Sequence, residues 1–259
     1  AWGIRWLKRR WYSFLSMQEH VAPRLSDVIV VSESSGQDVA ECLGVSAANI
    51  SVIPLGIDQT VFKPQPQITR EPLRLLTTAS ADVPLKGLKY LIEAYAQLLP
   101  AWPALKLVVI GKLREGPTAE MLDDLGLAGR VEFVSDLTQQ EVVEQYARAT
   151  LCVTPSLYEG FGLPAAEAMS CGSPVVVTDG GALPEVVGDA GVVVRKGDPE
   201  ALASAIGQLL KDPSRRAAMG DAALERAAER FSWPRAAEAY EVVLRRAMAR
   251  KADTAYRRG

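Results

Sequence analysis

Two carboxylates, Glu159 and Glu167, flank a glycine-containing turn. Residues 151–154 before them are apolar and rich in β-forming side chains, and the segment after them runs to Gly172, a typical helix stop. The pattern predicts a strand, then a loop that contains Glu159, then a helix with Glu167 one turn inside it. Both acids are therefore expected to border the same turn.

The turn itself predicts an anion-binding site. Gly160 and Gly162 let the backbone approach a ligand closely, and Pro164 suits the first helical turn, where its missing N–H is no loss. The free N–H groups of that turn and the helix dipole favour a negative charge. An anion site between two acids that can accept hydrogen bonds from hydroxyl groups suits a phosphorylated sugar compound.

Three alternatives for this segment stay open. Gly160 to Ala165 also fits the Gly-x-Gly-x-x-Ala pattern of dinucleotide-binding enzymes, with Asp179 as the ribose acid. The five residues 155–159 between strand and glycine, the internal Pro164 and the late position of the unit weigh against a NAD or flavin enzyme. A glycosidase with an acid and a nucleophile would need one raised pKa without a visible cause. The plainest alternative is two unrelated acids.

The composition limits the class of protein. The 259 residues allow one large domain or two small ones, 48% of them are hydrophobic, and the net charge of −2 gives no general attraction to nucleic acid. Cys42, Cys152 and Cys171 lack metal-type spacing and are expected as buried free thiols in a reducing cytosol. With His20 as the only histidine, no histidine-based metal site is expected within this chain.

The elements that must position the turn alternate along the chain, which predicts a mostly parallel sheet covered on both faces. Such sheets bind ligands at the carboxyl ends of their strands. Lys86, Glu159, Gly162 and Asp179 follow predicted strands, so they are expected to share one crevice. The expected strands are 27–32, 51–55, 73–78, 105–110, 130–134, 151–154, 174–178 and 191–194. The expected helices are 34–42, 88–98, 119–125, 139–149, 183–187, 199–210, 214–230 and 234–250, with a frayed end at 251–259.

Residues 1–25 are expected to be helical. Residues 2–14 hold five aromatic and four basic side chains, a mixture typical of a helix at a membrane surface. The alternative is a helix that packs on a partner domain and exposes a basic edge. The chain has no apolar run of transmembrane length and no signal peptide pattern. A cytoplasmic location is therefore expected, with contact at the inner face of the membrane as a further hypothesis.

Four ordered motifs resemble the retaining glycosyltransferases of family 4, which have the GT-B fold. They are the two glutamates with seven residues between them, including Gly-Phe-Gly, followed by 174–181; the segment 52–58; the pair 86–87; and the segment 231–233. The resemblance covers roughly residues 25–250. It implies an α/β protein with a complete C-terminal Rossmann-like donor domain and the end of an incomplete N-terminal one.

The same resemblance gives the domain organisation. Residues 1–62 would be the C-terminal part of the N-terminal, acceptor-binding domain, 63–230 the nucleotide-sugar donor domain, and 231–259 the crossover helix and tail. The chain starts without a methionine. It is therefore expected to be the inner part of a longer protein, with the rest of the acceptor domain as its partner and little activity by itself.

The resemblance also implies a role for each site residue. Glu159 would contact the donor sugar near the reacting carbon, and Lys86 would neutralise the leaving diphosphate; these two are the candidate catalytic residues. Glu167 would accept both ribose hydroxyls. Further donor contacts would come from Gly160, Phe161, Gly162, Leu163 and, beside the base, Leu137.

One position departs from the family pattern. The family usually has an arginine about six residues before the loop lysine, and this position is Ser80. A neutral hydrogen bond contributes roughly 0.5–1.5 kcal/mol net and a charge-assisted one about 1.5–3 kcal/mol. Ser80 is therefore expected to bind the donor more weakly than the arginine, unless another cation compensates.

The resemblance thus implies an enzyme that moves a sugar from a nucleotide diphosphate sugar to an unidentified glycan, lipid or small-molecule acceptor, with retention and with neither metal nor cofactor. No nucleic acid is expected as a partner. Three other functions stay open: a nucleotide-sugar binding module without turnover, another GT-B enzyme such as an epimerase or a phosphorylase, and a NAD-dependent Rossmann enzyme.

Overall fold

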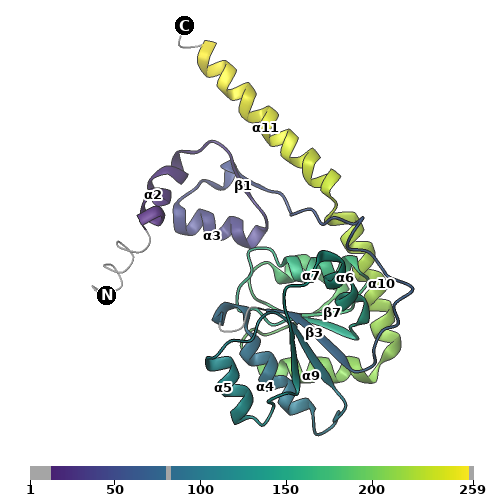
Figure 1. Ribbon diagram of the computed structural model, residues 1–259. Helices are drawn as coiled ribbons and strands as arrows, with labels where there is room; N and C mark the ends of the chain where they lie inside the picture. The colour runs from purple at the N-terminus through teal and green to yellow at the C-terminus, as the bar shows by residue number, and fades with distance from the viewer. Residues whose placement is uncertain (1–12, 80–82, 257–259) are drawn as a thin grey trace. The chain divides into compact units, whose positions relative to one another are not determined.

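The computed structural model describes residues 13–79 and 83–256 (Figure 1). Contacts divide the chain into two compact units, one formed by Ala1–Pro54 together with Pro234–Gly259 and the other by Leu55–Trp233. Residues 55–62 thus belong to the larger unit. The domain bounds expected from the sequence stay predictions, because compactness does not show which segments fold independently.

The smaller unit is built on two short parallel strands, β1 (Val28–Val30) and β2 (Ile50–Val52), joined through α3 (Glu33–Leu43). Both strands have three residues and are shorter than expected. The hydroxyl of Ser32 accepts a hydrogen bond from the Ser35 N–H and so begins α3. The last helix, α11 (Trp233–Tyr256), packs Ala236 and Val243 against Ile53 of this unit.

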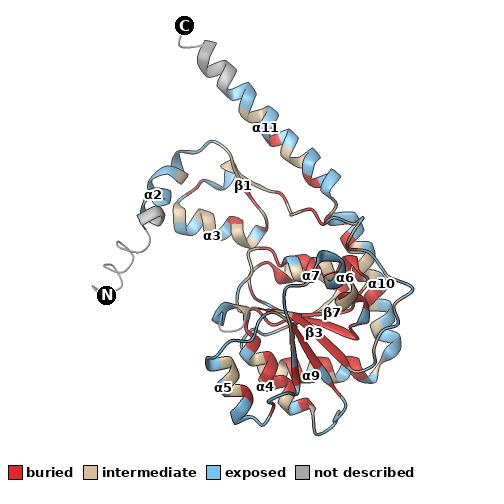
Figure 2. Ribbon diagram, in the orientation of Figure 1, coloured by how far each residue is buried: buried red, intermediate tan, exposed pale blue. Residues whose placement is uncertain are grey.

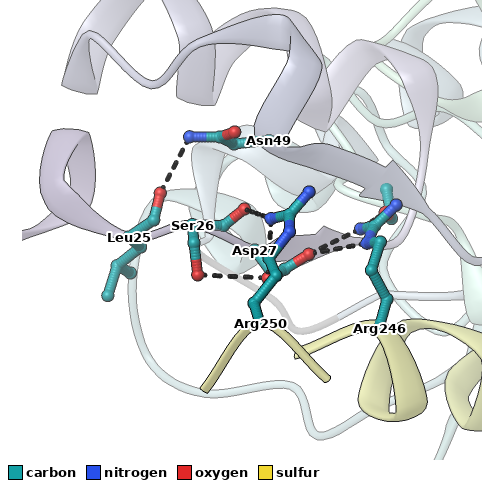
Figure 3. A network of polar contacts seen from close by, with 7 residues as sticks. Leu25, Ser26, Asp27, Asn49, Arg246 and Arg250 are labelled. Atoms are coloured by element: carbon teal, nitrogen blue, oxygen red, sulfur yellow. Dashed lines mark hydrogen bonds and ion pairs between the residues drawn. The ribbon is translucent and has the colours of Figure 1, made fainter. Parts of the chain in front are cut away.

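A carboxylate holds α11 to the first strand of this unit, as Figure 3 shows. The Asp27 side chain, only 9% exposed, accepts hydrogen bonds from Arg246 Nε at 2.8 Å and Arg250 Nη1 at 3.1 Å. Burial favours the neutral acid, but the bonds from Arg246 and Ser26 and the charge of Arg250 keep the pKa of Asp27 below its usual value. The helix α11 continues through Tyr256, where a frayed end at 251–259 was expected.

The larger unit is a six-stranded parallel sheet with the strand order β5-β4-β3-β6-β7-β8. Its first strand, β3, lies in the middle, so the chain builds outward in one direction, returns, and builds outward in the other. The central strands β3, β6 and β7 are buried along nearly their whole length, as is typical of parallel strands covered on both faces, and β6 and β7 are mostly apolar (Figure 2). The strands are β3 (Arg74–Thr78), β4 (Lys106–Ile110), β5 (Val131–Val134), β6 (Leu151–Thr154), β7 (Val175–Thr178) and β8 (Val192–Val194).

Helices cover both faces of this sheet (Figure 1). On one face α4, α5 and α9 bury leucines and isoleucines in a single core with β3 and β4, and on the other α6, α7, α8 and α10 pack on the sheet and on one another. The predicted α/β fold is therefore confirmed. The helices are α4 (Leu88–Leu98), α5 (Pro117–Asp124), α6 (Gln139–Arg148), α7 (Leu163–Ser170), α8 (Leu183–Val187), α9 (Pro199–Lys211) and α10 (Pro213–Arg230).

The remaining elements are short. The helix expected over residues 1–25 is represented by α2 (Ser13–Val21) and a 3₁₀ turn at Ala22–Arg24; residues 1–12, with most of the aromatic and basic side chains, lie outside the described residues. Further 3₁₀ turns are Ala47–Asn49, Pro84–Lys86 and Gly188–Ala190. No helix among the described residues is long and apolar enough to cross a membrane.

Candidate active site

The candidate site lies at the carboxyl ends of β3 and β6. These adjacent strands mark the point where the strand order reverses, because the chain continues from β3 to one side of the sheet and from β6 to the other. Loops that leave the sheet at such a point diverge and leave a crevice between them. The loop after β3 carries Lys86, and the loop after β6 carries Glu159.

The two loops are pressed together at Gly87. This residue has φ +65°, and a Cβ atom there would lie 1.9 Å from the carbonyl oxygen of Pro155. Next to this contact the Leu157 N–H donates to the Leu85 carbonyl at 2.8 Å. Only glycine combines this backbone conformation with such a close approach. The contact sets the distance between the two loops and thus between their functional side chains.

The loop after β6 is also held from its other side, by the segment after β7. The Glu159 N–H donates to Gly180 O at 3.2 Å, and the Ala182 N–H donates to Glu159 O at 2.9 Å. The buried Thr178 hydroxyl donates to the Ser156 carbonyl. Because its main chain is bonded in both directions, Glu159 projects from a rigid position although it lies in a loop.

Lys86 and Glu159 meet in the crevice. Lys86 Nζ donates to Glu159 Oε1 at 2.8 Å, and the hydroxyl of Ser156 donates to the same oxygen at 2.8 Å. The lysine side chain is 35% exposed and the glutamate 13%, so a ligand can reach the lysine more easily. The pair places a cation and a carboxylate side by side, and both of these bonds are on Oε1 of Glu159.

Glu167 lies on α7 and is half-buried. Its Oε2 accepts a hydrogen bond from the Tyr146 hydroxyl at 3.0 Å, and Thr78 Oγ1, at the end of β3, lies 3.5 Å from that hydroxyl. Burial raises the pKa of the Glu167 carboxyl, and the bond from Tyr146 partly offsets this effect. The chain of contacts ties Glu167 to the same end of β3 that carries the Lys86 loop.

Two helices begin at the crevice without a side-chain cap. The N-cap residues of α4 and α7 are Gly87 and Gly162, both with positive φ. By contrast, α3, α6, α9 and α10 have Ser32, Thr138, Asp198 and Asp212 as caps whose side chains accept backbone N–H groups. Within these first turns the Tyr90 N–H donates to Gly87 O and the Ala165 N–H donates to Gly162 O. The positive dipole ends of α4 and α7, which have no side-chain cap, still favour an anion.

The structure shows how the other predicted residues are presented. Phe161 is buried and packs edge-to-face on Phe231, with ring centroids 5.5 Å apart, so only its main chain can meet a ligand. Leu163, at the start of α7, is 41% exposed. Leu137 is half-buried and directly precedes the Thr138 cap of α6. Gly160 lies in the loop with Glu159, and Ser80 lies outside the described residues.

Asp179 was expected to share the ligand crevice with Lys86 and Glu159, but its bonds in the structure connect two strands of the sheet. Its Oδ1 accepts the Lys196 N–H at 2.7 Å, and its own N–H donates to Val194 O at 2.8 Å. These bonds join the ends of β7 and β8. The carboxylate is therefore a structural acceptor in the sheet, and the ribose role that a dinucleotide enzyme would require of it has no support from these contacts.

Sequence reasoning missed three polar residues that hold the acids, namely Tyr146, Ser156 and Thr178. Thr178 had a signal, because a hydroxyl at the last position of an apolar strand lies at the ligand edge of the sheet. Ser156 lies only three residues before Glu159. No sequence signal pointed to Tyr146, because the buried positions 143, 146 and 147 of α6 have the spacing of an ordinary core face.

Metal binding has no visible centre in the part of the chain that the structure describes. There, no group of three or more His, Cys, Asp and Glu side chains is arranged to hold an ion. Cys152 and Cys171 are buried, and burial raises the pKa of the Cys152 thiol to about 12. Cys42 is exposed, although all three thiols were expected to be buried. The expected independence from metals stays a prediction.

A doubly wound parallel sheet with charged side chains on the loops at its topological switch point is typical of nucleotide-binding α/β domains. The chain belongs to a particular family of this class. It matches the family Glycosyl transferases group 1 over residues 61–226, which contain Lys86, Glu159 and Glu167. The predicted membership of a GT-B glycosyltransferase family is thereby confirmed.

Individual relatives agree with this membership. The chain is 39% identical to the MMP alpha-(1->4)-mannosyltransferase of Mycolicibacterium hassiacum, over 97% of this chain and 61% of that protein. It is 30% identical to the D-inositol 3-phosphate glycosyltransferase of Kineococcus radiotolerans, over 89% and 59%. Sucrose-phosphate synthase from Thermosynechococcus elongatus has a similar structure, with a TM-score of 0.79, 26% identity and coverage of 91% of this chain and 61% of that one. The chain thus spans about three fifths of the length of these relatives.

Replacing Gly87 with alanine tests the contact between the loops. Gly126 is the matched control, because it also has φ +65° but a Cβ atom there would meet nothing within 4 Å. Gly126→Ala is expected to lower the free energy of unfolding by about 1–2 kcal/mol through backbone strain alone. Gly87→Ala should cost clearly more, as measured by denaturant unfolding. If both variants lost the same free energy of unfolding, the loops after β3 and β6 would be able to move apart at no cost.

Replacing Glu167 with glutamine tests its burial. Because its pKa is raised, the folded protein binds the proton more tightly than the unfolded chain, so wild-type stability falls as pH rises above about 4.3. Glutamine does not ionise. The melting temperature of Glu167→Gln relative to wild type should therefore be higher at pH 7 than at pH 4, by about 2–4 °C for each kcal/mol. If the difference in melting temperature between Glu167→Gln and wild type did not change with pH, the raised pKa of Glu167 would be contradicted.

Proposed function

We propose that the chain carries the donor half of an enzyme that transfers a sugar from a nucleotide diphosphate sugar to a hydroxyl acceptor, with retention of configuration. The contact of Lys86 with Glu159 at the switch point is the observation that carries the proposal. It puts one cation beside two uncapped helix N-termini, where a diphosphate would lie, and one carboxylate beside it, where the sugar would lie. Family membership supports the same assignment.

Lys86 would act on the leaving group. As the bond between sugar and diphosphate breaks, negative charge grows on the diphosphate, and a lysine with two helix dipoles stabilises that charge where it develops. Without a donor, Lys86 is paired with Glu159 at 2.8 Å. A diphosphate carries more negative charge than one carboxylate. A bound donor would therefore draw Lys86 toward the diphosphate and away from Glu159 Oε1.

Glu159 would then accept hydrogen bonds from hydroxyls of the donor sugar. Ser156 still holds Oε1, and the main-chain bonds of Glu159 keep its position. A carboxylate close to the reacting carbon also favours the positive charge that develops on the sugar ring in the transition state. Glu167, with Oε2 held by Tyr146, would offer Oε1 to the ribose of the nucleotide.

The relatives suggest which donors and acceptors come first in a search. The relative with 39% identity is named as an α-(1→4)-mannosyltransferase, so mannose leads the donor sugars. An α product corresponds to retention when the donor is α-linked. Inositol 3-phosphate, in the name of the second relative, leads the acceptors.

Ligand binding can be tested on this chain with UDP, GDP, ADP and their sugars, by thermal shift and then by calorimetry. One of the three bases should stabilise the chain, by about 2.7 kcal/mol at a concentration of 100 times its Kd. Glu167→Ala should weaken that ligand by about 2 kcal/mol, roughly 30-fold, because a charged acceptor is lost. An unchanged Kd would remove Glu167 from the ribose.

Turnover requires the full-length protein. There, Glu159→Gln is expected to lower kcat about 100-fold while the donor Kd changes only a few-fold, because the charge acts mainly in the transition state. Glu241→Gln, which removes the same charge from an exposed pair with Arg245, serves as the control and should leave both values unchanged.

Three results would point elsewhere. An effect of Glu159→Gln on Kd alone would assign it to ground-state binding. A full-length protein that binds a donor but releases no nucleoside diphosphate with any acceptor would be a binding module. A product of inverted configuration would remove retention from the proposal.

A further inference from the structure

We propose that Tyr146 is a positioning residue for the ribose site: its hydroxyl orients Glu167 so that the carboxylate can accept hydrogen bonds from the ribose hydroxyls of the donor. The inference rests on the proposed nucleotide-sugar function. It adds to that function a residue on α6 which lies behind the ligand site and which the sequence motifs do not include.

The hydroxyl of Tyr146 occupies a junction of three elements. The side chain is 2% exposed, and its oxygen lies 3.0 Å from Glu167 Oε2 on α7 and 3.5 Å from Thr78 Oγ1 at the end of β3. Because the Tyr146 hydroxyl donates its hydrogen bond to Glu167, the Tyr146 oxygen can accept a hydrogen bond from the Thr78 hydroxyl. The tyrosine thus bridges β3 and α7.

The tyrosine itself is held at both ends. Its ring packs against Phe62, with centroids 6.4 Å apart at an angle of 59°. Its main-chain carbonyl accepts the hydroxyl of the fully buried Ser173 at 2.7 Å. A residue fixed in this way has few alternative positions for its hydroxyl. It therefore transmits a fixed position to Glu167 Oε2.

The chemistry of a buried carboxylate makes this bond important for a ligand. A glutamate side chain has three rotatable bonds, and one charged hydrogen bond to a rigid donor removes most of this freedom before the ligand arrives. With Oε2 fixed, Oε1 presents its lone pairs in one direction. Without the hydroxyl, the carboxylate would have to find another donor, and the ribose would meet it in a range of orientations.

The test compares Tyr146→Phe with Tyr95→Phe. Tyr95 is fully buried, and its hydroxyl donates to Leu105 O at 2.9 Å and to Arg130 O at 3.2 Å, so it is a buried tyrosine that does not contact the site acids. Calorimetry on each variant would use the nucleoside diphosphate that wild type binds, in its ribo form and its 2′,3′-dideoxy form. Denaturant unfolding would follow the loss of stability in parallel.

In Tyr146→Phe the affinity for the ribonucleotide should fall about tenfold, which corresponds to loss of one charged hydrogen bond of about 1.4 kcal/mol. The affinity for the dideoxynucleotide should stay the same, so the ratio of the two shrinks. Tyr95→Phe should lose stability but keep the wild-type ratio.

Two outcomes would overturn the proposal, and one would overturn the proposed function instead. If Tyr146→Phe leaves both affinities as in wild type, Tyr146 does not position Glu167. If it loses both affinities equally, its role is structural. If wild type itself binds both forms equally, the assignment of Glu167 to the ribose fails, whatever the tyrosine does.

Discussion

The close approach of two loops at Gly87 determines most of what this domain can do. A parallel sheet that reverses its strand order leaves a crevice at the reversal, but the width of the crevice depends on how the loops pack. Here Gly87 lies against the carbonyl of Pro155, and the helix α4 starts at the same glycine. One residue therefore positions Lys86 near Glu159 and leaves the N-terminus of α4 without a side-chain cap.

The site acids are held in different ways, in keeping with different tasks. Glu159 is fixed through its main chain by the segment after β7, and its side chain shares one oxygen between Lys86 and Ser156. Glu167 is fixed through its side chain by Tyr146 on α6. The two acids therefore have separate supports, because the side-chain bonds of Glu159 come from Lys86 and Ser156 and that of Glu167 comes from Tyr146.

The site also has a cost in stability. Burial raises the pKa of Glu167, so the charged carboxylate lowers the stability of the folded domain at neutral pH. The helices α4 and α7 begin at glycines without a side-chain cap, whereas Ser32, Thr138 and Asp198 cap α3, α6 and α9. Both features lower the stability of the domain, and under the proposed function a bound nucleotide would offset them.

The sequence by itself determined the class of fold, because buried parallel strands and amphipathic helices have patterns that are local. It also indicated Lys86 and Glu159, because they follow predicted parallel strands whose ends form a ligand edge, and Glu167, because it lies one turn inside the helix after the glycine turn. The resemblance to a family gave these residues their expected roles. Only the tertiary structure decided that β3 and β6 are neighbours, that Lys86 and Glu159 touch, that Asp179 serves the sheet, and that Tyr146 faces Glu167. Each of these depends on contacts between residues far apart in the chain, which composition and periodicity do not encode.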